Sequence, residues 1–202
     1  GDTGSMTGHS PKATTDAVTA QMANGITAML PVENALHVSK DLQERFGLPL
    51  WQFTVSATDA NRHSIRYARL ITGRSKIVVI DKCYHGSVDE TFATLDDAGN
   101  TVMREGNLGA PVSLDQTTRV VEFNDLEGME KALAHGDVAA ILMEPAMTNI
   151  GIVLPEKGYL KKVGELAKKY GVIWIIDETH TISAGVGGMT KDLGLKPDML
   201  TI

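Results

Sequence analysis

The sequence predicts an α/β fold built on a mostly parallel sheet, because strand-like and helix-like segments alternate along most of it. Five short apolar runs rich in β-branched residues have the length and composition of buried strands: 76–80, 119–123, 138–143, 172–176 and 199–202. No internal repeat or low-complexity segment interrupts this order. We therefore expect parallel strands that lie side by side, with helices on both faces of the sheet.

Helix-like segments make up the other half of the pattern and are predicted at 14–23, 33–46, 58–72, 125–134 and 156–170. Several carry end signals: Asn124 is the predicted cap of one helix, and Gly73 and Gly171 follow two others. The polar stretch 94–118 has no strong period and is longer than a routine connection. We expect it to be a functional or mobile loop.

Composition limits the classes of partner. The 202 residues include 19 lysines and arginines against 25 aspartates and glutamates, a net charge of −6, so the chain lacks a general basic field for nucleic acid or anionic lipid. The single cysteine, Cys83, rules out an intramolecular disulfide framework. No apolar run approaches the roughly 18 residues of a membrane helix, and the first residues lack a signal-peptide pattern. We expect a cytoplasmic protein without nucleic-acid or membrane partners.

Polar and aromatic residues follow three of the predicted strands: Tyr84 and His85, Glu144 and Asn149, and Asp177, Thr179 and His180. Ligands bind beyond the carboxyl ends of parallel strands, so these side chains are expected on one rim of the sheet. Residues 56–60 begin a predicted helix, whose free backbone N–H groups suit a phosphate. Asp177 follows so apolar a run that its carboxylate is expected to have a cationic partner.

Each motif also has a purely structural interpretation. In that interpretation, residues 56–59 do no more than cap a helix, Asp177 and Glu178 cap the next turn, and Tyr84 is a core residue. A metal site is a further alternative, since plausible ligands occur among these residues, but neither an HExxH pattern nor paired cysteines are present. A nucleotide-binding fold is disfavoured because no strand precedes a GxGxxG or GxxxxGK(S/T) motif. The joint appearance of the polar residues at successive strand ends favours a ligand site.

The ordered motifs resemble those of the class III aminotransferases, which are fold-type I enzymes dependent on pyridoxal 5'-phosphate. The resemblance covers essentially the whole chain through these segments: 56–60, 83–86, 123–127, 144–145 with 149–151, 177–178 and 197–202. Residues 84–86 and 123–125 are most similar to the branch of glutamate-1-semialdehyde aminomutases and β-amino acid transaminases. The resemblance implies that residues 1–202 form an incomplete large cofactor-binding domain, with 1–46 as a helical dimer-interface segment and 47–202 as the αβ core.

The resemblance also implies roles for individual residues. Ala57 and Thr58 would bind the cofactor phosphate at a helix N-terminus. Tyr84 would stack on one face of the pyridine ring and Thr179, where the family usually has valine, on the other. Asp177 would hold the ring nitrogen protonated, and the pyridinium would then be its expected cationic partner.

Four further residues complete the implied site. His180, in place of the family's common Gln or Met, and Asn149 would reach the phenolic oxygen of the ring. His85 would shape the pocket and its hydrogen bonds, and Glu144 belongs to the same cofactor-binding set. The Schiff-base lysine would fall just beyond Ile202, so no catalytic residue is assigned within the chain and the chain alone is expected to be inactive.

For the activity, the resemblance implies amino transfer between a small-molecule amino donor, an amino acid or amine, and a carbonyl acceptor, in a homodimer. Two alternatives stay open. One is an intramolecular reaction, that of glutamate-1-semialdehyde 2,1-aminomutase. The other is a noncatalytic binding module that keeps the fold.

Overall fold

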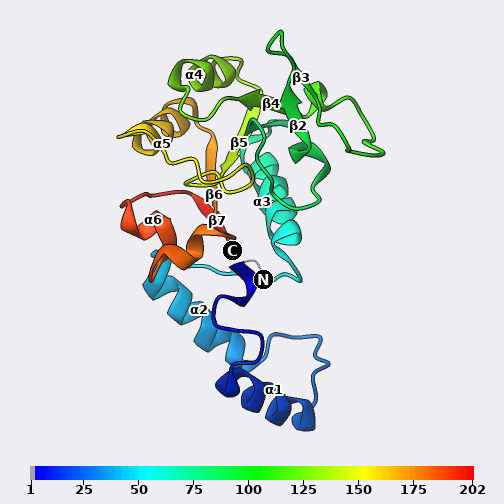
Figure 1. Cartoon of the computed structure of the whole chain (residues 1–202), viewed down its shortest axis with the longest axis vertical. Coiled ribbons are helices and arrows are strands. Elements are labelled where there is room, and N and C mark those ends of the chain that lie inside the picture. The colour runs from blue at the N-terminus through cyan, green and yellow to red at the C-terminus, as the bar shows by residue number, and fades with distance from the viewer. Residues whose placement is uncertain (1–2) are drawn as a thin grey trace. The chain divides into compact units, whose positions relative to one another are not determined.

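The computed structural model describes residues 3–202 (Figure 1). The chain divides into two units, with the boundary between Trp51 and Gln52. The N-terminal unit contains η1 (Thr3–Ser5), α1 (Lys12–Asn24) and α2 (Glu33–Phe46). Its described residues include no buried side chain. Both helices lie where the sequence predicts them, and α2 ends at Gly47, whose φ of 75° is left-handed.

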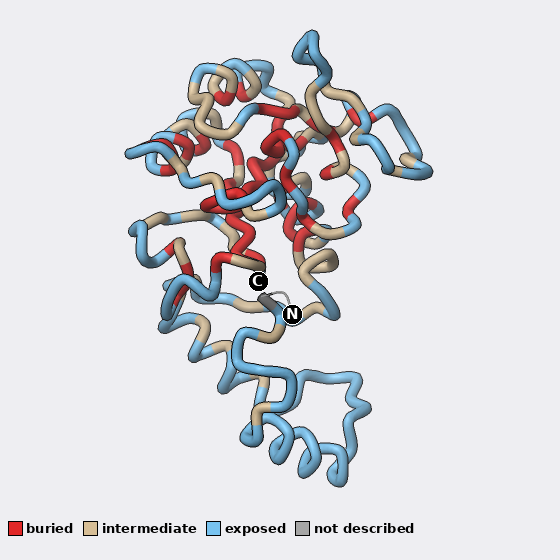
Figure 2. Tube along the Cα trace, in the orientation of Figure 1, coloured by how far each residue is buried: buried red, intermediate tan, exposed pale blue. Residues whose placement is uncertain are grey.

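The second unit contains a five-stranded sheet in the order β4-β1-β5-β6-β7, in which every pairing is parallel. Its strands are β1 (Lys76–Ile80), β4 (Thr118–Val121), β5 (Val138–Met143), β6 (Ile173–Asp177) and β7 (Met199–Thr201). The buried residues gather along these strands (Figure 2), and all six residues of β5 are buried. The predicted α/β class with a mostly parallel sheet is therefore confirmed.

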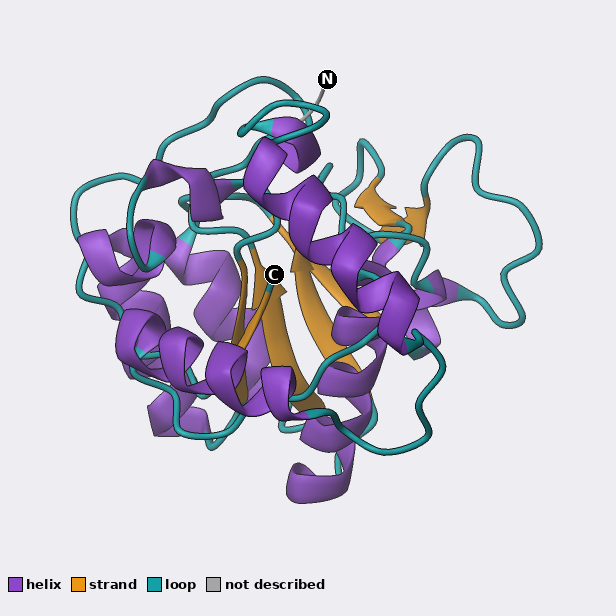
Figure 3. Ribbon diagram, turned by 90° about the horizontal axis from the view of Figure 1, so that it is seen from below, coloured by secondary structure: helices purple, strands orange, loops and turns teal. Residues whose placement is uncertain are grey.

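Helices cover both faces of the sheet, which explains why its strands are apolar on both sides. They are α3 (Ala57–Thr72), α4 (Leu126–Ala134), α5 (Tyr159–Tyr170) and the short α6 (Gly188–Asp192). The helix α3 contacts β5, β6 and β7, while α4 contacts β4 and α5 contacts β6. Figure 1 shows α3 on one side of the strands and α4 with α5 on the other, and Figure 3 shows the strands of the sheet side by side.

The caps of the helices differ from the prediction at one place. Ser56 caps α3, since its Oγ accepts a hydrogen bond from the backbone N–H of Asp59 at 3.2 Å. The cap of α4 is Asp125, which accepts from the N–H of Gly128, so the predicted cap Asn124 is wrong. Asn124 has a φ of 69°, and its amide bonds to the loop before α5 instead, donating to the Leu154 carbonyl.

The stretch 94–118 is also more ordered than predicted. It contributes to an antiparallel pair of β2 (Ala93–Leu95) and β3 (Thr101–Met103) and contains the 3-10 turn η3 (Leu114–Gln116). Two further 3-10 turns are η2 (Asp89–Thr91) and η4 (Thr181–Ala184). The buried carboxylate of Asp81 holds the pair by accepting from the Leu95 N–H at 2.9 Å. Strands of three residues show too little alternation for sequence periodicity to detect.

None of the helices within residues 3–202 has the length and apolarity that crossing a bilayer requires.

Candidate functional site

A cavity of about 240 Å³ lies at the carboxyl ends of β1, β5 and β6, beside the N-terminus of α3. Its lining is Ser56, Ala57, Thr58, Asn61, Tyr84, His85, Gly86, Glu144, Asp177, Thr179 and His180. The structure thus brings together every predicted site residue except Asn149. The Asn149 amide instead donates to the Lys82 carbonyl at 3.0 Å, just before the loop that carries Tyr84.

A larger cavity, about 680 Å³, lies along β4 and α4 and contains none of the predicted residues. Arg119, one of the cations that line it, is paired with Asp137 at 2.7 Å. The smaller cavity is therefore the candidate site, because it gathers the side chains that can do chemistry.

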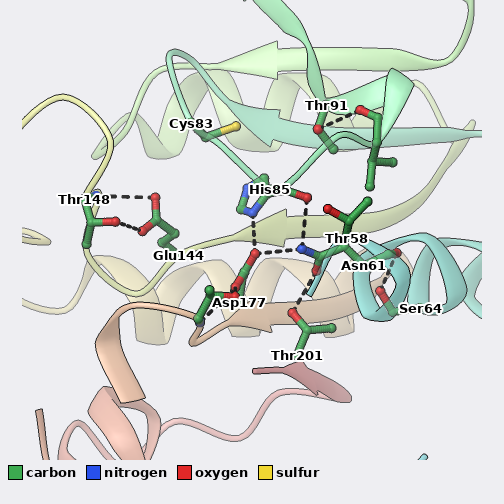
Figure 4. Close-up of polar contacts among 12 residues, drawn as sticks. Thr58, Asn61, Ser64, Cys83, His85, Thr91, Glu144, Thr148, Asp177 and Thr201 are labelled. Atoms are coloured by element: carbon green, nitrogen blue, oxygen red, sulfur yellow. Dashed lines mark hydrogen bonds and ion pairs between the residues drawn. The ribbon is translucent and has the colours of Figure 1, made fainter. Parts of the chain in front are cut away.

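The carboxylate of Asp177 stands at the end of β6 and is almost fully buried (Figure 4). Its Oδ2 accepts hydrogen bonds from Nδ1 of His85 and Nδ2 of Asn61, both at 2.8 Å. Its Oδ1 accepts from the Thr179 N–H at 3.0 Å and the Thr179 hydroxyl at 2.6 Å. Burial raises the pKa of Asp177, but these donors, His85 foremost, outweigh it and lower the pKa to about 2. Asp177 is therefore ionised at neutral pH.

The cation beside Asp177 is the imidazole of His85, whose side chain is fully buried. Burial lowers the pKa of His85, but the neighbouring Cys83 and the Asp177 carboxylate raise it, and the balance is well above its ordinary value of 6.5. The sequence-based expectation of a cation near Asp177 is met within the chain itself. Nε2 of His85 is buried and has no hydrogen-bond partner among the described residues.

The other end of the cavity is a close contact between the start of α3 and the loop after β1. Thr58 Oγ1 accepts a hydrogen bond from the Ser87 N–H at 3.1 Å. Gly86 has a φ of +77°, and a Cβ added to it would lie 2.1 Å from Thr58 Oγ1. Only glycine fits there. The first N–H groups of α3 have no partners within the helix, so this end of the cavity suits an anion such as phosphate.

Glu144 and Tyr84 complete the walls. Burial raises the pKa of Glu144, and its carboxylate accepts hydrogen bonds from the N–H and the hydroxyl of Thr148. Tyr84 is 47% exposed, with its ring packed edge-on against Phe92 at a centroid distance of 6.4 Å. The core interpretation of Tyr84 is therefore wrong.

The contacts of two buried polar residues, Asn61 and Glu178, could not be predicted from the sequence. Asn61 is fully buried and bonds to Asp177, although its position alone did not single it out. The signal was an amide on the helix face that also carries Ile65 and Ala68, because such a group needs buried partners. The interpretation of Glu178 as a cap of the next turn is wrong, because η4 has no side-chain cap. The Glu178 carboxylate instead accepts from the Met189 N–H at 3.2 Å and from Thr190, at the start of α6, and from the Thr181 hydroxyl.

No group of three or more potential metal ligands occurs within residues 3–202. The polar groups that line the cavity include an ionised carboxylate, a buried imidazole and a helix N-terminus. Together they suit an aromatic heterocycle that carries a phosphate.

Comparison with known proteins agrees with the motif-based resemblance. Glutamate-1-semialdehyde 2,1-aminomutases from Ignicoccus hospitalis and Methanocella arvoryzae are 33% and 34% identical to this chain over 199 residues, which is 96% of the chain and 47% of each relative. The chain thus spans about half the length of the curated relatives it matches.

Solved structures show the same likeness. A glutamate-1-semialdehyde aminomutase from Pseudomonas aeruginosa PAO1 superposes with a TM-score of 0.95 at 50% identity over 98% of this chain and 44% of that one. A lysine-to-alanine variant of it, solved in complex with PMP, gives the same values. An omega-transaminase from Sphaerobacter thermophilus has a TM-score of 0.86 at 31% identity, covering 95% of this chain and 47% of that one. The model of the aminotransferase class-III family matches residues 3–202, and the chain belongs to that family.

Proposed function

We propose that the protein containing this chain uses pyridoxal phosphate to transfer an amino group between an amino acid or amine and a carbonyl compound, and that this chain supplies much of the cofactor pocket. The observation that carries the proposal is the Asp177 carboxylate, kept ionised at a strand-end cavity by His85. Relatives that are named as aminomutases and transaminases, and a similar structure in complex with PMP, support it.

The residues present fit this cofactor. The N-terminus of α3 with Ala57 and Thr58 would bind the phosphate, beside the close contact between Gly86 and Thr58. Asp177 would accept a hydrogen bond from the protonated ring nitrogen at Oδ1, in place of the one from the rotatable Thr179 hydroxyl. When bound, the cofactor supplies an electron-withdrawing ring that stabilises the charge left on a substrate carbon as a proton departs.

The remaining lining residues orient and enclose the ring in this proposal. Tyr84 offers a partly exposed aromatic face. Thr179 lines the cavity just after the end of β6, and its hydroxyl donates to Asp177. His180 and Glu144 line the same cavity and would contact the polar edge of the ring or the substrate. Asn149 would act indirectly, by holding the backbone of Lys82.

Assembly and location are part of the same proposal. The N-terminal unit exposes apolar side chains that include Ile26 at 70% and Leu30 at 79%, as expected of a surface that contacts another subunit. We propose a cytoplasmic homodimer in which residues 1–46 form the dimer-interface segment and residues 1–30, of which 1 and 2 lie outside the described residues, contribute to the neighbouring site. The Schiff-base lysine expected to follow Ile202 stays a prediction, as does the inactivity of the chain alone.

An intramolecular aminomutase is the second candidate, because several relatives bear that name. The two reactions differ in one requirement. A transaminase needs a separate keto-acid or aldehyde acceptor for each turnover, whereas an aminomutase converts a single semialdehyde.

The test uses the full-length gene product with an Asp177→Ala variant and an Asp97→Ala control at an exposed turn. We expect the wild type and the control to bind PMP tightly and the Asp177 variant to bind it at least tenfold more weakly, measured by calorimetry. A wild-type protein that binds no PMP would contradict the proposal. Product analysis with and without a keto-acid acceptor then separates transaminase from aminomutase.

A further inference from the structure

We propose that Asn61 is a positioning residue for the cofactor: its amide fixes the Asp177 carboxylate, and Thr201 fixes the orientation of that amide. The inference rests on the proposed function. It concerns a side chain that touches Asp177 directly and acts on a bound ring through it.

Asn61 is fully buried and joins four parts of the structure (Figure 4). From α3, its Nδ2 donates to Asp177 Oδ2 at 2.8 Å and to the His85 carbonyl at 3.2 Å. Its Oδ1 accepts from the Thr201 hydroxyl of β7 at 2.7 Å. One side chain therefore ties the helix, the end of β6, the loop after β1 and the end of β7 together.

Only one orientation of the Asn61 amide satisfies these neighbours. Asp177 Oδ2 and the His85 carbonyl can only accept hydrogen bonds, so the NH₂ end of the amide must face them. A flipped amide would bring its oxygen against the carboxylate. The Thr201 hydroxyl donates to the remaining oxygen and so holds the productive orientation.

His85 and Asn61 hold the same carboxylate oxygen with different consequences. His85 brings a positive charge and so sets the ionisation of Asp177. Asn61 is neutral and brings direction: with His85 it fixes Oδ2, while Thr179 fixes Oδ1. Without Asn61, a buried carboxylate would lose one donor and could rotate away from a ring nitrogen.

The place of Asn61 on α3 gives this contact a second consequence. The same helix begins with Ser56 and Thr58, at the end of the cavity that suits phosphate. The contact between Asn61 and Asp177 therefore sets the spacing between the phosphate end and the ring-nitrogen end of the pocket. A ligand that spans both ends depends on this spacing, and a free phosphate ion does not.

That difference defines the experiment, in which the full-length gene product is titrated with PMP and separately with inorganic phosphate. We expect Asn61→Leu to weaken PMP binding about tenfold or more and to change phosphate binding less than about twofold. Ser64→Ala is the matched control: Ser64 is buried on the same helix and bonds to the Asn61 carbonyl, not to Asp177. It should leave both affinities near the wild-type values.

Thr201 gives an independent pair of variants. Thr201→Val removes the hydroxyl and should weaken PMP binding, whereas Thr201→Ser keeps the donor and should restore it. This pair carries the test if Asn61→Leu does not fold.

Asn61→Asp adds a signature that loss of packing would not produce. At low pH the introduced carboxyl is protonated and can donate to Asp177 as the amide does; at higher pH two carboxylates face each other, and PMP binding should weaken. His85 and Glu144 are titratable groups close to Asp177, so the pH profile of the variant is compared with that of the wild type.

Two results would overturn the inference while the proposed function stands. The first is that the wild-type protein binds PMP and a folded Asn61→Leu protein binds it just as tightly. The other is an equal loss of PMP and phosphate affinity. A wild-type protein that binds no PMP would instead refute the proposed function and this inference with it.

Discussion

Substituting Gly86 by alanine tests how closely the loop after β1 approaches the start of α3. The added Cβ would lie 2.1 Å from Thr58 Oγ1 and 2.9 Å from Thr58 Cα, where ordinary contact begins at 3.4 Å. The loop must therefore move by about 1 Å or more, at an overpacking cost of about 1–3 kcal/mol. The left-handed backbone, with φ of +77°, adds about 1 kcal/mol. We expect the free energy of unfolding to fall by about 2–4 kcal/mol.

Gly73→Ala is the matched control for this substitution. Gly73 ends the same helix with a φ of +68°, but nothing lies within 4 Å of an added Cβ. It should lose only the backbone contribution, about 1 kcal/mol. Urea denaturation of the full-length variants gives the difference, and PMP titration should show weakened binding for Gly86→Ala alone. Equal losses of stability, or unchanged PMP binding in the Gly86 variant, would refute the role of this close contact between Gly86 and Thr58.

Three further predictions concern the groups around Asp177 and the start of α3. Thr179→Val removes a 2.6 Å hydrogen bond, so the pKa of Asp177 should rise from about 2, as followed by NMR of its carboxyl carbon; an unchanged pKa would count against the contact. In the wild type, the free energy of unfolding should decline as pH falls from 3.8 towards 2, when the lowered pKa of Asp177 no longer contributes. That contribution is worth roughly 2 kcal/mol at neutral pH. The free energy of unfolding should decline again as pH rises above 6.5 and through the raised pKa of His85. The His85→Asn variant should lack this alkaline decline in urea denaturation measured across pH. An alkaline decline that persists in the variant would contradict the prediction. Ser56→Ala should lower the free energy of unfolding by about 1 kcal/mol through loss of its cap to Asp59, and no loss in urea denaturation would mean that the cap is not formed.

The sheet and most of the candidate site could be predicted because both follow from short-range patterns. Apolar runs locate the strands, and parallel strands bring their carboxyl ends to one rim, which is how Asp177 and His85 come to bond despite lying 92 residues apart. The sequence pattern also indicates that an acidic group after such a run needs a cation, and the structure identifies it as His85.

Other features depend on contacts that a linear pattern does not contain. Asn149 follows a strand as the other site residues do, but its amide is used by the Lys82 backbone. Asn61 looks like an ordinary helical residue until its partners on three other segments are known. The hairpin after Asp81 consists of strands too short to leave a period. In each case a long-range hydrogen bond decides the role.

The most direct test of the account is the protonation state of the ring nitrogen in bound PMP. With PMP labelled at that nitrogen and bound to the full-length protein at neutral pH, the ¹⁵N NMR shift should be that of a protonated ring, because Asp177 is ionised and lines the cavity. Asp177→Ala should shift the signal to that of an unprotonated ring. An unprotonated ring in the wild type, or a signal unchanged by Asp177→Ala, would contradict the assignment of this pocket.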